Sequence, residues 1–308
     1  MALHQASGRT SLGIGLSVTT AACWATLPIA LKLMLEALDP ITLTWFRFLV
    51  AALLTGAWLK VRGHLSGYGA LGRRGWIMLA VAAAMLVGNY VFYLLGVQRT
   101  TPGNAQLIIQ LAPLLMALGG IWVFGERFRL AQWLGLALLV GGMGLFFSDQ
   151  LRAAMDAPGY VQGSLLVVLA AVVWAVYALA QKQLLMRLGS MQVLVFIYAV
   201  AALVLWPFAR PATLLALDAL QWALLAFCAL NTVVAYGAFA EALAHWEASR
   251  VSAVLATTPL LCLAAVAAVH ALWPASLAPE PISVLGWLGA LLVVAGSASV
   301  SLLGRRRA

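Results

Sequence analysis

Residues 23–32 read CWATLPIALK, and residues 173–182 read VWAVYALAQK. Each segment lies inside a long apolar run, and each places a lysine eight residues after the Trp of a Trp-Ala pair. Trp24 and Trp174 are therefore related by an offset of 150 residues. This match predicts that one helix occurs twice in the chain, as part of an internal repeat.

Further matches follow in the same order along both halves. At an offset of 146 residues, Tyr90 matches Tyr236, Tyr93 matches Phe239, and residues 113–115 match 259–261. At an offset of 154, residues 133–135 match 287–289. We therefore expect two repeats, residues 1–150 and 151–308, with five helices each. An odd number of membrane crossings reverses the chain, so the second repeat is expected to be inverted, an architecture typical of secondary transporters.

The composition agrees with a membrane protein. Of 308 residues, 64% are hydrophobic and 9% are charged, against about 25% charged in a soluble domain. These values exclude a soluble enzyme, a secreted disulfide scaffold and a disordered chain. A spanning helix needs roughly 20 apolar residues, which predicts an all-α integral membrane protein with ten transmembrane helices. The predicted spans are 12–35, 40–59, 76–98, 102–123, 130–148, 160–186, 190–208, 219–243, 249–272 and 282–303.

The basic residues predict the orientation. The net charge of +9 is spread between apolar blocks and forms no basic face, so nucleic acid is not an expected partner. Arginine and lysine are enriched in cytoplasmic loops. One side collects Arg9, Lys60, Arg62, Arg73, Arg74, Arg127, Arg129, Lys182, Arg187, Arg250, Arg305, Arg306 and Arg307, and the other holds Lys32, Arg99, Arg152 and Arg210. We therefore expect both termini in the cytoplasm, with the protein in a bacterial inner membrane.

Polar and aromatic residues near the middle of the spans are the candidate substrate-binding residues. Polar groups are costly in lipid, so their helix faces should point into the bundle. Core packing for the aromatic rings and hydrogen bonds between helices for the amides are the alternatives. The candidates are Trp24, Asn89, Tyr90, Tyr93, Gln106, Gln110, Trp174, Tyr177, Asn231 and Tyr236.

Three prolines and one arginine also lie inside predicted spans. Pro28, Pro113 and Pro259 each free a backbone carbonyl and permit a kink, so they are candidate hinges, although proline is common in membrane helices. Arg47 is the only charged residue well inside a span. It could snorkel to the outer interface, attract an anionic group, or make a structural hydrogen bond.

Glycines are dense in spans 130–148 and 282–303, which carry few polar residues. Small residues let helices approach closely. We expect these two spans to pack between the halves or between protomers and to lie outside the substrate path.

Several chemistries have no residues to support them. No Asp or Glu lies deep in a span, which argues against a buried carboxylate proton relay. The chain has no Walker A motif, no His-Glu-x-x-His motif and no buried acidic pair. The sequence therefore predicts neither catalytic nor metal-binding residues and no cofactor.

Taken in order, several short motifs resemble the drug/metabolite transporter superfamily in its EamA-type form of ten helices. They are Cys23-Trp24-Ala25, residues 44–48 (TWFRF), residues 106–113, Gly125-Glu126, and the Trp-Leu-Gly runs at 133–135 and 287–289. The tyrosine-rich span 76–98 and Trp174 look most similar to the YddG-type exporters. This resemblance implies export of aromatic and other neutral amino acids.

Our hypothesis from the sequence is an inner-membrane exporter of amino acids and related metabolites that works by alternating access through a central cavity. A multidrug carrier or a nucleotide-sugar carrier of the same superfamily is the alternative, followed by a channel-like membrane protein. The expected partners are a small-molecule substrate and the lipid bilayer. The oligomeric state stays open, and a monomer would suffice.

Overall fold

The computed structural model describes residues 9–63, 67–124, 129–154, 159–246, 251, 254–275, 277 and 282–303, whose regular elements are all helical. The helices are α1 (Thr10–Met34), α2 (Pro40–Val61), η1 (Tyr68–Ala70), α3 (Gly72–Arg99), α4 (Pro102–Ile108), α5 (Leu111–Phe124), α6 (Leu130–Ala154), α7 (Tyr160–Leu184), α8 (Ser190–Leu205), η2 (Trp206–Phe208), η3 (Pro211–Ala216), α9 (Ala219–His245), α11 (Thr258–Leu272) and α12 (Val284–Leu303). Six of the described helices are long and apolar enough to cross a membrane. The all-α membrane fold is confirmed.

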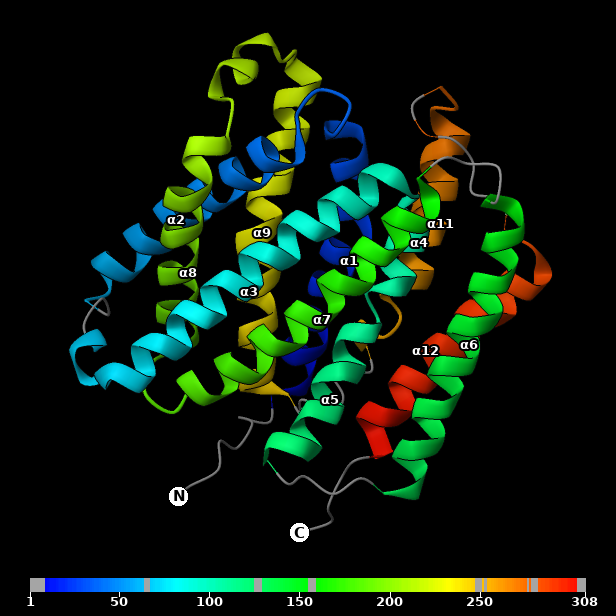
Figure 1. The fold of residues 1–308 in the computed structure, drawn as a ribbon, viewed down its shortest axis with the longest axis horizontal. Coiled ribbons are helices and arrows are strands. Elements are labelled where there is room, and N and C mark those ends of the chain that lie inside the picture. Colours follow the sequence, from blue (N-terminus) through cyan, green and yellow to red (C-terminus); the bar gives the residue numbers. More distant parts are fainter. Residues whose placement is uncertain are drawn as a thin grey trace.

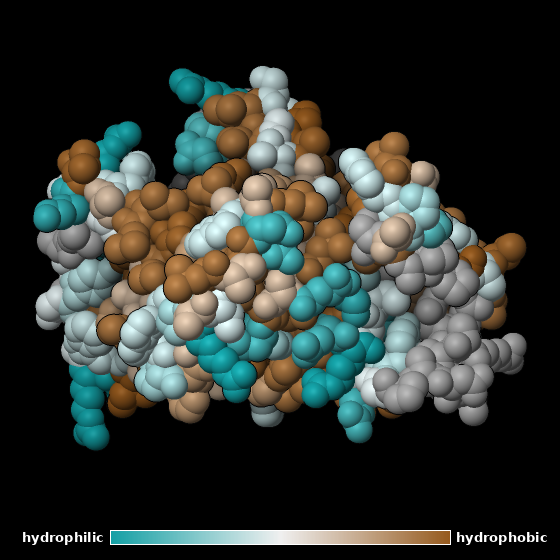
Figure 2. Space-filling view, turned by 90° about the horizontal axis from the view of Figure 1, so that it is seen from above, coloured by the Kyte–Doolittle hydropathy of each residue, from teal (hydrophilic) through white to brown (hydrophobic). Residues whose placement is uncertain are grey.

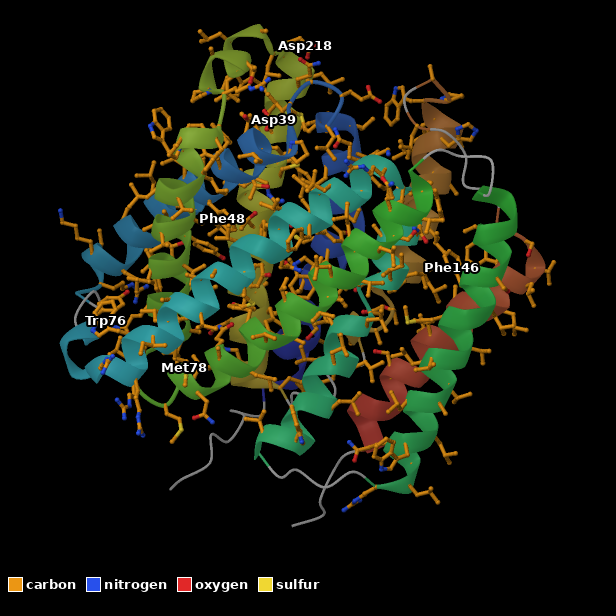
Figure 3. The ribbon with its side chains drawn as sticks, viewed as in Figure 1. Asp39, Phe48, Trp76, Met78, Phe146 and Asp218 are labelled. Atoms are coloured by element: carbon orange, nitrogen blue, oxygen red, sulfur yellow. The ribbon has the colours of Figure 1, made fainter. Side chains whose placement is uncertain are left out.

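Two of the long helices, α2 and α9, begin at capping aspartates that lie at one end of the molecule. The Asp39 carboxylate accepts hydrogen bonds from the backbone N–H groups of Ile41 and Thr42 at the start of α2. At the start of α9, the Asp218 carboxylate accepts one from the N–H of Gln221. Such caps satisfy amides that have no partner within the helix. Figure 3 shows Asp39 and Asp218 near the same upper end.

The most extensive helix contacts recur when the two repeats are exchanged. α3 packs along α7, and their repeat equivalents α9 and α1 pack along each other. α5 contacts α7 just as α11 contacts α1, and α6 packs along its own equivalent α12 (Figure 1). Paired contacts of this kind define a pseudo-twofold axis between the halves.

Glycine contacts between α6 and α12 follow the same symmetry. A Cβ atom on Gly142 would lie 2.6 Å from the carbonyl oxygen of Gly289, and one on Gly296 would lie 2.5 Å from that of Gly135. The offset of 154 residues relates Gly135 to Gly289 and Gly142 to Gly296. These backbones touch, so the described contacts place the glycine-rich helices against each other, between the halves of one chain.

The two repeats run in opposite directions. In Figure 1, α1 starts at the lower end of the molecule and runs upward, whereas α7 starts at the upper end and runs downward. The last turns of α12 return to the lower end, where α1 starts. Seen from the upper end, the surface mixes hydrophilic and hydrophobic residues (Figure 2).

Two of the predicted spans are not single helices, which corrects the sequence-based prediction. Residues 102–123 form α4 and α5, separated by Ile109 and Gln110. In residues 249–272, a new helix, α11, starts at Thr258, directly after a turn at residues 256–257. Each of the other eight predicted spans contains one α-helix, although the 3-10 helix η2 follows α8 within the span 190–208, and α6 extends furthest past its predicted end.

Proline explains both interruptions. Pro113 and Pro259 lack the N–H that would bond the carbonyl four residues earlier, which belongs to Ile109 and to Leu255. The Ile109 carbonyl instead accepts from the N–H of Ala112, at 2.9 Å. The Leu255 carbonyl accepts from the Thr258 hydroxyl, at 2.6 Å. Local donors thus replace the missing amides, and the helix axis is free to change direction at each break.

Candidate substrate site

An aromatic cluster joins α1 to α9 around Trp24. The Trp24 ring lies 5.7 Å from the Tyr236 ring and nearly perpendicular to it, at 68°. Phe239 approaches the same indole at 5.8 Å. Edge-to-face geometry of this kind is favourable between aromatic rings. All three side chains are partly buried, so two predicted site residues, Trp24 and Tyr236, meet at the packed helix pair α1–α9.

Arg47 is buried and faces α9. Its side chain is 2% exposed. Its Nε and Nη2 atoms lie 3.2 and 3.1 Å from the Thr232 hydroxyl oxygen, and Nε lies 3.3 Å from the Cys228 carbonyl oxygen. The snorkelling interpretation is therefore wrong, because the guanidinium turns into the bundle. Figure 3 shows the neighbouring Phe48 at a height between Asp39 and Trp76.

Tyr90 connects Arg47 to the aromatic cluster. The Arg47 guanidinium carbon lies 4.8 Å from the Tyr90 ring centroid, a cation–π contact. Phe48 packs on the same ring at 4.5 Å. The Tyr90 side chain also interacts with those of Tyr236 and Thr232. Residues from α1, α2, α3 and α9 thus form one continuous group.

Trp174 and Tyr177 form a second aromatic pair on α7. Their rings lie 6.3 Å apart at 64°. Trp174 is partly buried and packs against the main hydrophobic core, whereas Tyr177 is 2% exposed. The Tyr177 hydroxyl has no hydrogen-bond partner among the described residues. Trp24 and Trp174 are repeat equivalents, yet Trp24 packs on α9 and Trp174 contacts a ring of its own helix.

Two of the predicted amides bridge helices. The Asn89 side chain donates to the Ala170 carbonyl at 2.9 Å, which links α3 to α7. The Asn231 side chain donates to the Cys23 carbonyl at 2.8 Å, which links α9 to α1. In this conformation both amides make the interhelical bonds that were the alternative to substrate contact. The side-chain oxygen of Asn231, Oδ1, is buried and has no hydrogen-bond partner within the described residues.

The two glutamines lie along α4 and at its end. The Tyr93 hydroxyl donates to the Gln106 carbonyl oxygen at 3.3 Å. Gln110 sits in the first break, and its amide donates to the Ala256 carbonyl in the second break at 3.4 Å. Gln106 and Gln110 are both nearly buried. The breaks of the two repeats therefore touch each other.

The candidate hinge prolines occupy different helix positions. Pro28 is buried inside the continuous helix α1. Pro113 is the third residue of α5, and Pro259 is the second residue of α11. Pro113 and Pro259 therefore mark the starts of helices after the two breaks.

Sequence reasoning missed Phe48, Tyr198 and Thr232. Phe48 and Tyr198 occupy equivalent repeat positions, at an offset of 150, and their rings contact each other at 5.7 Å. Extending the repeat alignment into residues 40–59 would have exposed this pair. Nothing in the sequence singles out Thr232, because a threonine inside a helix usually bonds its own backbone.

Two inverted helical repeats with polar and aromatic residues between them are an architecture typical of membrane transporters. The comparisons with known proteins specify the family. The EamA-like transporter family matches residues 11–148 and again 161–302, and the chain belongs to it. The protein is therefore a multi-pass inner-membrane transporter and not an enzyme.

Two of the relatives cover nearly the whole chain. The "Uncharacterized inner membrane transporter YhbE" of Escherichia coli K12 is 39% identical over 97% of this chain and 93% of its own length. An "Uncharacterized transporter" of Haemophilus influenzae is 33% identical over 96% of each chain. The "Aromatic amino acid exporter YddG" of Ancylobacter novellus is 30% identical over 58% of this chain and 61% of its own length. A solved crystal structure with 22% identity shares the fold, with a TM-score of 0.65 over 97% of this chain and 100% of that chain.

Proposed function

We propose that this EamA-like transporter exports aromatic and other neutral amino acids. The substrate would move by alternating access through a cavity between the two repeats. The observation that carries the proposal is the group in which Trp24, Tyr90 and Tyr236 meet, supplied by helices of both repeats. Apolar faces with a few polar atoms suit a side chain that is apolar or aromatic.

The relative named as an aromatic amino acid exporter gives independent support, because it shares 30% identity over 181 residues. The polar residues of the proposed site would bind the two ends of the zwitterion. Asn89, Gln106, Gln110 and Asn231 supply amide donors and acceptors. Their present bonds to backbone and side chains would have to be exchanged for bonds to substrate, so we expect low affinity and broad selectivity.

The charge inventory argues against the other carriers of this superfamily. Arg47 is the only buried charged side chain among the described residues. A carrier of drug cations would require a buried carboxylate to offset the positive charge. A nucleotide-sugar carrier would require several cations for its phosphates. One buried arginine fits a substrate with one carboxylate better than either.

Counterflow in reconstituted liposomes tests the function. Vesicles would be loaded with unlabelled phenylalanine, tryptophan, threonine or methionine, and uptake of labelled phenylalanine would be followed without an ion gradient. We expect saturable uptake that is stimulated by amino acid on the opposite side. Failure of every amino acid to drive exchange in correctly folded protein would reject the proposal. Conductance without saturation would indicate a channel.

We also propose that both termini lie in the cytoplasm. The start of α1 and the end of α12 share one end of the molecule (Figure 1), in agreement with an even number of crossings. The Lys and Arg excess on that side supports the cytoplasmic assignment. A fluorescent protein that matures only in the cytoplasm, fused after Ala308, should fluoresce. If the fluorescent fusion is dark, and a phosphatase that is active only in the periplasm is active when fused at the same site, the proposed orientation is wrong.

A further inference from the structure

Four tyrosines share one buried region with Arg47, whose guanidinium lies 4.8 Å from the Tyr90 ring centroid, and we call this group the Arg47–tyrosine cluster. Its members are Arg47, Tyr90, Tyr177, Tyr198 and Tyr236. They come from α2, α3, α7, α8 and α9, so both repeats contribute. The Phe48 ring lies 4.5 Å from the Tyr90 ring and 5.7 Å from the Tyr198 ring, and Tyr177 belongs to the same buried core.

The cluster is rich in donors and poor in acceptors. A guanidinium has five N–H donors and accepts nothing. Within the described residues its hydrogen-bond acceptors are the Thr232 hydroxyl and the Cys228 carbonyl, and the Thr232 hydroxyl already donates to that same carbonyl, at 3.0 Å.

Two tyrosine hydroxyls add to the surplus. Tyr177 is 2% exposed and Tyr198 is 1% exposed. Neither hydroxyl has a hydrogen-bond partner among the described residues. Buried polar atoms are normally paired, so two unpaired hydroxyls in a group that also holds one buried cation point to a missing acceptor.

Charge specifies what that acceptor is. No carboxylate is among the buried residues of the described chain, so the positive charge of Arg47 is offset only by neutral groups. A buried cation is stabilised when an anion accepts its hydrogen bonds. One cation matches one negative charge, whereas a phosphate dianion would require more.

We propose that the Arg47–tyrosine cluster binds the carboxylate of the transported substrate. The carboxylate would accept hydrogen bonds from the Arg47 guanidinium and from the Tyr177 and Tyr198 hydroxyls. The rings of Phe48 and Tyr90, which pack at 4.5 Å, would contact the apolar body. This inference rests on the proposed function for the identity of the substrate, and it adds that the carboxylate is the group recognised.

Binding to the purified protein tests the cluster without transport. The thermal unfolding midpoint would be measured while adding 3-phenylpropionate, its neutral isostere 3-phenylpropanamide, or phenyl phosphate. We expect the carboxylate to bind at least about 10-fold more tightly than the amide, since a hydrogen bond to a charged group is worth roughly 1.5–3 kcal/mol. Equal stabilisation by carboxylate and amide, or stronger stabilisation by phenyl phosphate, would overturn the proposal.

Three variants assign the preference to residues. Arg47→Gln should reduce the ratio of amide to carboxylate dissociation constants to about 1. Tyr198→Phe should weaken carboxylate binding by about 2- to 10-fold and amide binding less, since the hydroxyl that it removes bonds a charged oxygen more strongly than a neutral one. Arg62→Gln is the matched control, because Arg62 lies at the exposed end of α2 beside Trp58. It should behave as the unmodified protein does.

Tyr198→Phe keeps the test decisive if Arg47→Gln does not fold. It deletes a hydroxyl that has no partner within the described chain, so the variant should fold at least as stably. An unchanged carboxylate preference in Tyr198→Phe, or in folded Arg47→Gln, would assign the cluster a structural role.

The two proposals can fail separately. If the preference for carboxylate depends on Arg47 but no amino acid shows counterflow, the carboxylate site is retained and amino acids are rejected as the substrates. If phenylalanine shows counterflow, and phenylalaninamide inhibits it as strongly as unlabelled phenylalanine does, the transport function is retained and the carboxylate site is rejected.

Discussion

The side-chain amide of Gln110 donates to the backbone carbonyl of Ala256 at 3.4 Å, and these residues occupy the same position in the two repeats. Their offset of 146 residues is the one that relates Pro113 to Pro259. Equivalent positions that touch must lie on the pseudo-twofold axis. The two helix breaks therefore meet at the interface between the repeats, and broken helices at such an interface form the substrate sites of many secondary transporters.

This contact predicts a role for Gln110 in transport. Gln110→Leu removes the bond between the breaks and keeps the volume nearly constant. A net hydrogen bond is worth about 0.5–1.5 kcal/mol, so we expect phenylalanine counterflow to fall roughly 2- to 10-fold with the unfolding midpoint little changed. Gln98→Leu, at the exposed end of α3, is the control. Equal counterflow in the two variants would show that the contact between the breaks has no role in transport.

The repeat made much of the fold predictable. A Trp-Ala pair at 24 and 174, with matches in the same order downstream, indicated two similar halves, and an odd number of helices in each required inversion. Hydropathy located the spans but not their interruptions. A proline inside an apolar run can kink a helix or end it. Which occurs depends on whether a donor such as the Thr258 hydroxyl reaches the freed carbonyl.

The site was less predictable than the fold, because depth in a span does not give direction. Arg47 was identified as unusual, but its inward orientation depends on Thr232, which lies 185 residues away in sequence. Asn89 and Asn231 were chosen as polar and deep. Their amides donate to backbone carbonyls of neighbouring helices. Tertiary packing decides whether such an amide bonds a helix or a substrate, and the sequence alone does not show it.

Glycine packing between α6 and α12 can be tested at adjacent positions. A Cβ on Gly142 would lie 2.6 Å from the Gly289 carbonyl oxygen, whereas a Cβ on Gly141 meets nothing within 4 Å. We expect Gly142→Ala to separate the helices and to destabilise the protein by about 1–3 kcal/mol, an overpacking cost. Gly141→Ala should be neutral or stabilising by up to about 1 kcal/mol. Thermal unfolding in detergent measures both, and equal midpoints would contradict the close approach.

Lys32 provides a second stability prediction. Its ammonium lies 2.9, 2.9 and 2.7 Å from the carbonyl oxygens of Val97, Gln98 and Thr100, at the end of α3. Cations are favourable at helix C-termini, and hydrogen bonds from charged groups are worth about 1.5–3 kcal/mol. Lys32→Met should therefore lower the unfolding midpoint, with a loss of about 1–3 kcal/mol. Lys60→Met, on the exposed last turn of α2, should leave it unchanged. A Lys32→Met midpoint no lower than that of the control would show that the cap contributes nothing.

The aromatic residues give the most direct test of the substrate path. Trp174 is partly buried, and its ring lies 6.3 Å from that of Tyr177. If the Trp174 indole contacts substrate, Trp174→Ala should reduce phenylalanine counterflow by about 3- to 10-fold, because an aromatic contact is worth roughly 0.5–1.5 kcal/mol. Trp174→Phe should restore most of the rate, because it keeps an aromatic face at the same position.

Trp122 supplies the control for this series, because its side chain is 93% exposed on α5. Trp122→Ala removes the same ring from the surface and should leave counterflow unchanged. Trp24→Ala should impair transport and also lower the unfolding midpoint, since Trp24 packs on Tyr236 and Phe239. Trp174→Ala should still fold, and its unfolding midpoint, measured beside that of Trp24→Ala, separates a loss of transport from a loss of stability. Full activity in folded Trp174→Ala would assign that indole to packing and confine the substrate path to the side of Trp24.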